Sequence, residues 1–131
     1  MIEQIKNYES NILALEVIDG FTETDEKIFQ KFFHQKIIKG FDHINVLIKL
    51  DELKISKSAT KAFFEDMLWS LRNFKNLGRI AIVAHSRILK ASVPIDNLFF
   101  ERASKGREER YFDISQIEEA FRFVENTHSV Q

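Results

Sequence analysis

Short apolar runs alternate along this chain with longer segments in which apolar residues recur every three or four positions. Residues 12–18 and 80–84 are almost uninterrupted apolar runs, which is typical of strands buried on both faces of a sheet. Residues 44–50 alternate apolar and polar positions, as a strand with one wetter face does. Strands that alternate with helices favour parallel pairing, so the pattern predicts an α/β fold.

The predicted order of elements is ββαβαβαβα, which gives a mostly parallel mixed sheet of five strands with helices packed on it. Strands are predicted over residues 2–6, 12–18, 44–50, 80–84 and 110–112. Helices are predicted from Thr22 to Gly40, from about Ser58 to Phe74, over 86–100 and after Asp113. Thr22 and Asp25 have the spacing of a helix N-cap and its reciprocal partner, and Asp113 begins the last helix in the same way. A chain of 131 residues supports one hydrophobic core, so we expect a single domain over residues 1–131.

The composition argues against several classes of function. The chain has no cysteine, which excludes disulfides and thiolate chemistry and favours a reducing, cytoplasmic compartment. The first residues lack the pattern of a signal peptide, and no run approaches the roughly 20 apolar residues of a membrane-spanning helix. A net charge of −1 argues against nucleic-acid binding. The four histidines are scattered and the four glycines form no phosphate-binding loop, so neither a metal nor a cofactor is expected.

Several sequence blocks occur together in an order that is typical of one family. They are residues 17–25, 62–66, 78–84 and 110–113, followed by Ala120 in the last helix. With these blocks the chain resembles the SpoIIAA-like proteins over nearly its whole length. That family is related in fold to STAS domains and anti-sigma-factor antagonists, and is similar to lipid carriers of the CRAL-TRIO type. The resemblance implies a non-enzymatic domain that binds an apolar ligand or docks on a membrane surface.

One loop departs from the pattern of the antagonists. Their phosphorylated serine lies in a loop of the Asp-Ser-Ser-Gly type, and residues 51–58 stand in its place here. Ser56 and Ser58 are therefore candidate regulatory sites, although Ser58 fits a helix N-cap equally well.

The segment 87–102 interleaves apolar and basic residues, as a helix at a membrane interface does. Five basic residues against two acidic ones fall within residues 87–107, whereas residues from 108 onward carry six acidic against two basic ones. Each basic residue near an anionic surface contributes about 1 kcal/mol of attraction. The expected membrane or partner surface consists of Arg87, Lys90, Leu98, Phe99, Phe100 and Arg102. The alternative is that Leu98, Phe99 and Phe100 turn inward or meet a second subunit.

Pro94 interrupts this segment because it lacks a backbone donor. If the segment lifts away from the preceding helix, the gap becomes an apolar pocket suited to a fatty chain. The expected lining of this pocket is Phe63, Phe64, Met67, Leu71, Ile88 and Leu89.

Three other roles remain open at the level of sequence. A STAS-type module would contact a protein partner through the exposed helix face and the loop 55–58, under control of phosphorylation. A small hydrolase would use Asp51, His85 and Ser86, which follow two neighbouring strands, but no strained serine turn or oxyanion site accompanies them. A symmetric homodimer would bury an exposed apolar helix against its own copy.

Overall fold

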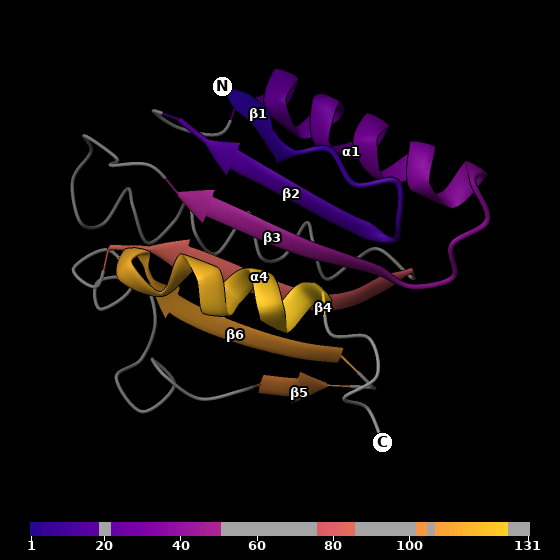
Figure 1. Cartoon of the computed structure of the whole chain (residues 1–131). Helices are drawn as coiled ribbons and strands as arrows, with labels where there is room; N and C mark the ends of the chain where they lie inside the picture. Colours follow the sequence, from indigo (N-terminus) through magenta and orange to yellow (C-terminus); the bar gives the residue numbers. More distant parts are fainter. Residues whose placement is uncertain (19–21, 51–75, 86–101, 105–106, 126–131) are drawn as a thin grey trace.

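A computed structural model describes residues 1–18, 22–50, 76–85, 102–104 and 107–125. These residues form a six-stranded sheet in the order β1-β2-β3-β4-β6-β5 (Figure 1). The strands are β1 (Ile2–Lys6), β2 (Ile12–Val17), β3 (Ile44–Leu50), β4 (Leu77–Ala84), β5 (Arg102–Ser104) and β6 (Arg107–Asp113). The described helices are α1 (Glu23–Ile38), the 3-10 helix η2 (Ile114–Gln116) and α4 (Ile117–Glu125), which directly follows η2.

Parallel pairing builds the centre of the sheet, and antiparallel pairing builds its two edges. The pairs β2 with β3, β3 with β4 and β4 with β6 are parallel. The pairs β1 with β2 and β5 with β6 are antiparallel. Every residue of β4 is buried, as expected for a strand covered on both faces. The predicted α/β fold with a mostly parallel mixed sheet is confirmed, and all five predicted strands are present.

β5 is a sixth strand that the sequence pattern did not predict. Its three residues, Arg-Ala-Ser, show no run of apolar or β-branched side chains, and the strand arises from antiparallel pairing with β6. Arg102, predicted to belong to a membrane or partner surface, is the first residue of this edge strand. β4 and β6 also begin earlier than the sequence predicted.

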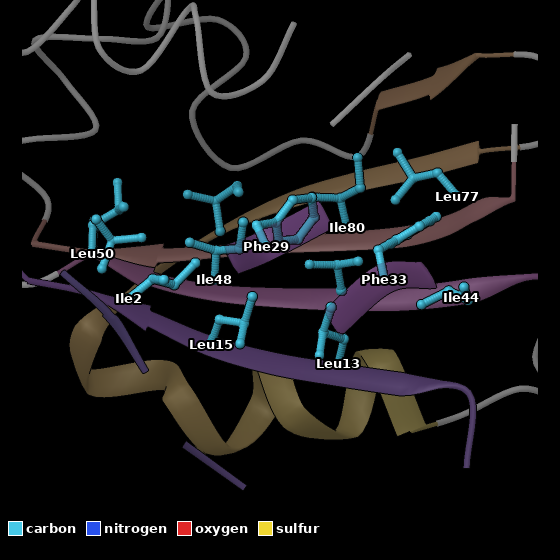
Figure 2. Packing of buried hydrophobic residues seen from close by; sticks show 14 of the residues in the cluster. Ile2, Leu13, Leu15, Phe29, Phe33, Ile44, Ile48, Leu50, Leu77 and Ile80 are labelled. Atoms are coloured by element: carbon cyan, nitrogen blue, oxygen red, sulfur yellow. The ribbon is translucent and has the colours of Figure 1, made fainter. Parts of the chain in front are cut away.

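The two described α-helices pack on opposite faces of the sheet. Alternate residues of the strands join Phe29 and Phe33 of α1 in one buried cluster, shown in Figure 2. The intervening residues, including Leu47, Ala81 and Val83, join α4 in a second cluster. We call the first surface the α1 face and the second the α4 face. Figure 2 shows α4 on the side of the sheet away from the labelled side chains.

Helix starts agree with the predicted caps. Thr22 and Asp25 form a reciprocal capping box at the start of α1, and Asp113 and Gln116 form another at the start of η2. α1 ends next to Gly40, whose φ of 96° lies in the left-handed region that glycine adopts at low cost. The predicted helices over 58–74 and 86–100 lie outside the described residues.

β3 is more deeply buried than its alternating pattern predicted. Asn45 is only 5% exposed, although the sequence assigned it to a wetter face. α4 covers this part of the sheet and provides a backbone partner for the Asn45 amide, which removes the need for water.

Candidate functional site

The carboxyl ends of the parallel strands are where open α/β sheets usually bind ligands. β2, β3, β4 and β6 all end at this edge, because they run parallel to one another. The register places Val17 beside Leu50, and Ala84 beside Asp113. Three described groups of polar residues lie at or beside this edge: the start of α1, His85 and the start of η2.

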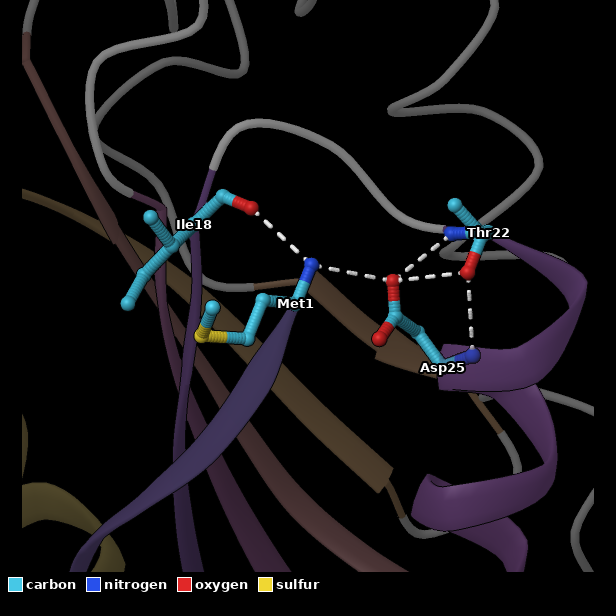
Figure 3. A network of polar contacts seen from close by, with 4 residues as sticks. All are labelled: Met1, Ile18, Thr22 and Asp25. Atoms are coloured by element: carbon cyan, nitrogen blue, oxygen red, sulfur yellow. Dashed lines mark hydrogen bonds and ion pairs between the residues drawn. The ribbon is translucent and has the colours of Figure 1, made fainter.

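The start of α1 holds a compact polar network (Figure 3). The Oδ2 atom of Asp25 accepts hydrogen bonds from the Thr22 amide at 2.9 Å and the Thr22 hydroxyl at 3.0 Å. It also pairs with the Met1 ammonium at 3.1 Å, and that ammonium donates to the Ile18 carbonyl oxygen at 3.0 Å. Asp25 is 5% exposed, so these partners compensate a buried carboxylate.

These contacts shift the pKa of Asp25. Burial alone would raise the pKa of this carboxyl group. The hydrogen bond from the Thr22 amide, together with the amino-terminal ammonium, outweighs burial and holds the pKa below its usual value. Asp25 therefore stays charged and stabilises the start of α1. A carboxyl group that acts as a general acid needs a raised pKa, and the pKa of Asp25 is shifted in the opposite direction.

The far end of the edge is also occupied by a cap. The Oδ2 atom of Asp113 accepts from the Ser115 amide at 3.0 Å and from the Ser115 hydroxyl at 2.6 Å. His85 lies between the two caps, directly after β4, and is partly exposed. The hydrolase hypothesis joined His85 to Asp51 and Ser86, and both of these residues lie outside the described part of the chain.

The other predicted site residues are not described by the structure. This applies to the candidate regulatory serines Ser56 and Ser58 and to the whole predicted pocket lining. Of the predicted membrane or partner surface, only the backbone of Arg102 is described, as the start of β5. The pocket and the surface therefore stay predictions.

A buried polar cluster on the α4 face was missed by the sequence reasoning. The Asn45 amide donates to the Val124 carbonyl oxygen at 2.9 Å, and its Oδ1 accepts from the Arg79 amide at 2.8 Å. The Arg79 guanidinium donates to the Phe123 carbonyl oxygen at 2.9 Å and lies 5.0 Å from the Phe123 ring centroid. These contacts cap the carboxyl end of α4, where carbonyl groups lack helical partners.

Gly78 makes room for this cluster. A Cβ atom at Gly78 would lie 2.3 Å from the Asn45 Oδ1 atom, which is closer than real Cβ contacts come. The sequence contained two signals for this cluster. One is the polar Asn45 within the mostly apolar β3, and the other is the Gly78-Arg79 pair in β4.

A second group of contacts ties the turn between β1 and β2 to both helices. Lys36 of α1 donates to the carbonyl oxygens of Tyr8 and Ser10, the latter at 2.6 Å. On the α4 face, the Tyr8 hydroxyl donates to Glu125 Oε2 at 2.5 Å. Burial, together with the Glu125 carboxylate, raises the pKa of the Tyr8 hydroxyl above its ordinary value.

Lys36 has the charge of a surface residue but the burial of a core residue. It is 7% exposed, and its burial lowers the pKa of its ammonium group, with Lys39 lowering it further and Glu9 acting in the opposite direction. Its two carbonyl partners explain why a lysine occupies the apolar side of α1.

The described residues also bear on metal binding and on membrane spanning. No group of three or more histidine, aspartate or glutamate residues within the described ranges is placed to hold a metal ion. None of the described helices combines the length and apolar character needed to cross a membrane.

The mixed sheet, its two helix-covered faces and the capped start of α1 define an α/β domain of the STAS type. A family model of the SpoIIAA-like proteins matches residues 12–125, and the chain belongs to that family. Neither the curated proteins nor the solved structures include a significant match.

Proposed function

We propose that this SpoIIAA-like domain is a non-enzymatic cytoplasmic protein that binds an apolar, lipid-like ligand or the surface of a membrane. The polar residues described at the carboxyl edge support the non-enzymatic part of this proposal. Thr22, Asp25 and Asp113 each hydrogen-bond at the start of a helix, so their polar groups are engaged in structure. Membership of the family supports a binding role as well.

The proposed contact region is the segment 87–102 together with the predicted pocket. Its sequence combines apolar residues with basic ones, and basic side chains near an anionic lipid surface each contribute about 1 kcal/mol. An apolar anchor such as Phe99 supplies the second contribution that stable interfacial binding requires.

Flotation with liposomes tests this proposal. We expect binding to anionic vesicles, weaker binding to neutral ones, and release at high salt because the attraction is screened. Phe99→Ser should weaken binding. Ile38→Ser is the matched control, because Ile38 is an exposed isoleucine at the end of α1, outside the proposed region. Absence of flotation under every condition would contradict membrane docking.

A second candidate, a STAS-type module that binds another protein, is favoured by the family match. In that case residues 55–58 contribute to the contact, and phosphorylation of Ser56 or Ser58 controls it. Ser56→Asp and Ser58→Asp should then change the affinity for a purified partner, while liposome binding stays the same.

A further inference from the structure

β1 lies at the edge of the sheet and offers backbone hydrogen-bonding groups on its outer side. It pairs with β2 and is the first strand in the sheet order. After Ile2, all of its residues are exposed. An exposed edge strand is a template for pairing with another strand, because its outer N–H and C=O groups have no ladder partner.

The hydrogen bonds at the start of β1 show which groups point outward. Met1 and Ile18 exchange two hydrogen bonds, from the Ile18 amide to Met1 O at 2.8 Å and from the Met1 ammonium to Ile18 O at 3.0 Å. In an antiparallel ladder such pairs alternate with pairs that exchange none. Glu3, which is in register with Glu16, is the next residue to bond inward. The N–H and C=O groups of Gln4 therefore point away from β2.

Two of the three large apolar side chains that are exposed among the described residues lie on the same edge. The large ones are Met1, Ile5 and Ile38, and Ile38 is 83% exposed. Met1 and Ile5 belong to the β1 segment, whereas Ile38 is the last residue of α1. This part of the surface thus combines an open backbone edge with apolar side chains, as strand-addition interfaces do.

The charges along β1 are complementary to a second copy of the same strand. The register shifts between Gln4 and Lys6, so Glu3 and Lys6 both lie on the α4 face, in register with Glu16 and Ala14. Glu16 pairs with Lys49 at 3.2 Å, whereas no described cation pairs with Glu3. Glu3 therefore lies beside a carboxylate that has its own cation, and a second cation near Glu3 would be favourable. The Lys6 ammonium lies at the rim of the same face, 5.3 Å from the Tyr8 ring centroid and 5.5 Å from that of Phe121.

We propose that two copies of this chain pair through β1 in an antiparallel, two-fold arrangement centred on Gln4. The outward backbone groups of Gln4 then bond to those of the other copy. Antiparallel pairing about Gln4 sets each Glu3 opposite Ile5 of the partner strand and next to its Lys6, so each carboxylate gains a neighbouring ammonium. The two sheets join into one, and the two α1 helices lie on the same face of it. This surface is distinct from the segment 87–102, and the proposal does not rest on the proposed function.

Cross-linking of the full chain tests the pairing directly. Because the chain has no cysteine, Gln4→Cys introduces a single thiol at the proposed two-fold axis. We expect a short bismaleimide to give covalent dimers of this variant. Glu118→Cys, on the exposed side of α4, is the matched control and should remain a monomer under the same conditions. Equal cross-linking of both variants, or of neither, would overturn the proposal.

Sedimentation velocity supplies an independent measurement. We expect the wild-type chain to shift from monomer to dimer with rising concentration. Gln4→Pro removes an outward N–H, which an edge strand tolerates, and should hold the chain as a monomer. Its thermal midpoint should match that of the wild type at concentrations where the wild type is monomeric. Glu3→Pro removes an inward N–H and should lower that midpoint. A wild-type chain that stays monomeric at its solubility limit, or a Gln4→Pro variant that still dimerises, would refute pairing through β1.

Discussion

The Asn45 side chain leaves no room for a side chain larger than hydrogen at position 78. A methyl group there would collide with the Asn45 Oδ1 atom and disturb two hydrogen bonds that Asn45 makes, to Arg79 and to Val124. We expect Gly78→Ala to lower the free energy of unfolding by about 2 kcal/mol in urea denaturation. In an Asn45→Ala background the same change should cost much less, because the colliding atom is gone. Equal losses in both backgrounds would contradict this account.

The free energy of unfolding should depend on pH through the ionisation of Asp25. Its pKa in the folded chain is held below the ordinary value of 3.8. The charged carboxylate therefore stabilises the fold above pH 3.8, and this stabilisation is lost as the pH falls through the lowered pKa. Asp25→Asn should reduce the free energy of unfolding by about 1 kcal/mol at neutral pH, through loss of the capping box.

Urea denaturation over a pH series checks this expectation. The difference between wild type and Asp25→Asn should shrink in acid. Glu23→Gln, an exposed change in the same first turn, is the control for loss of a negative charge near the helix start. A difference that stays constant down to the acid limit would show that the charge of Asp25 is unimportant.

At the scale of elements, α4 depends on partners that come from the sheet. Arg79 donates to the Phe123 carbonyl oxygen and packs on the Phe123 ring. Arg79→Met should lower the free energy of unfolding by about 2 kcal/mol, because a buried carbonyl group loses its donor. Amide hydrogen exchange should quicken most over residues 117–125. Arg122→Met, on the exposed side of α4, should leave the exchange unchanged; uniform quickening over the whole sheet would argue against a local anchor.

The elements differ in how far the sequence could predict them. α1 and η2 were predicted at the correct starts because a capping box is a local signal that Thr22 and Asp113 carry by themselves. β5 was missed because its pairing with β6 determines it, and its own three residues carry no strand pattern. The buried Lys36 and Asn45 were missed for a related reason, since their partners are backbone carbonyl groups that lie distant in the sequence.

The candidate site was less predictable than the fold. The sequence correctly placed His85 directly after a buried central strand. It did not reveal that Asp25 would bind the Met1 ammonium, because that contact requires β1 and α1 to lie side by side. Contacts between segments that are close only in the folded chain leave no pattern in the sequence.

At the scale of the whole molecule, the turn after β1 connects both layers of helices through Lys36 and Tyr8. Lys36 has a lowered pKa, so between that pKa and its ordinary value of 10.5 the unfolded chain binds more protons than the folded one. Stability therefore rises with pH across this window. Relative to Lys36→Met, the wild-type free energy of unfolding should increase as the pH approaches 10.5.

Chemical denaturation of both proteins over an alkaline series measures this difference. Lys31→Met, which removes an exposed lysine of the same helix, is the control. If the difference between wild type and Lys36→Met does not change with pH, burial does not affect the ionisation of Lys36 in the way proposed.

The hydrogen bond from Tyr8 to Glu125 joins residues 117 positions apart, and this has a consequence for a chain that is still being made. At a synthesis rate of about 5–20 residues per second, Glu125 leaves the ribosome roughly 6–25 s after Tyr8. During that interval Ile12 and Ala14, which end up in the cluster that α4 completes, have no helix to cover them. The amino-terminal half of the nascent chain is therefore the part that a chaperone would protect longest.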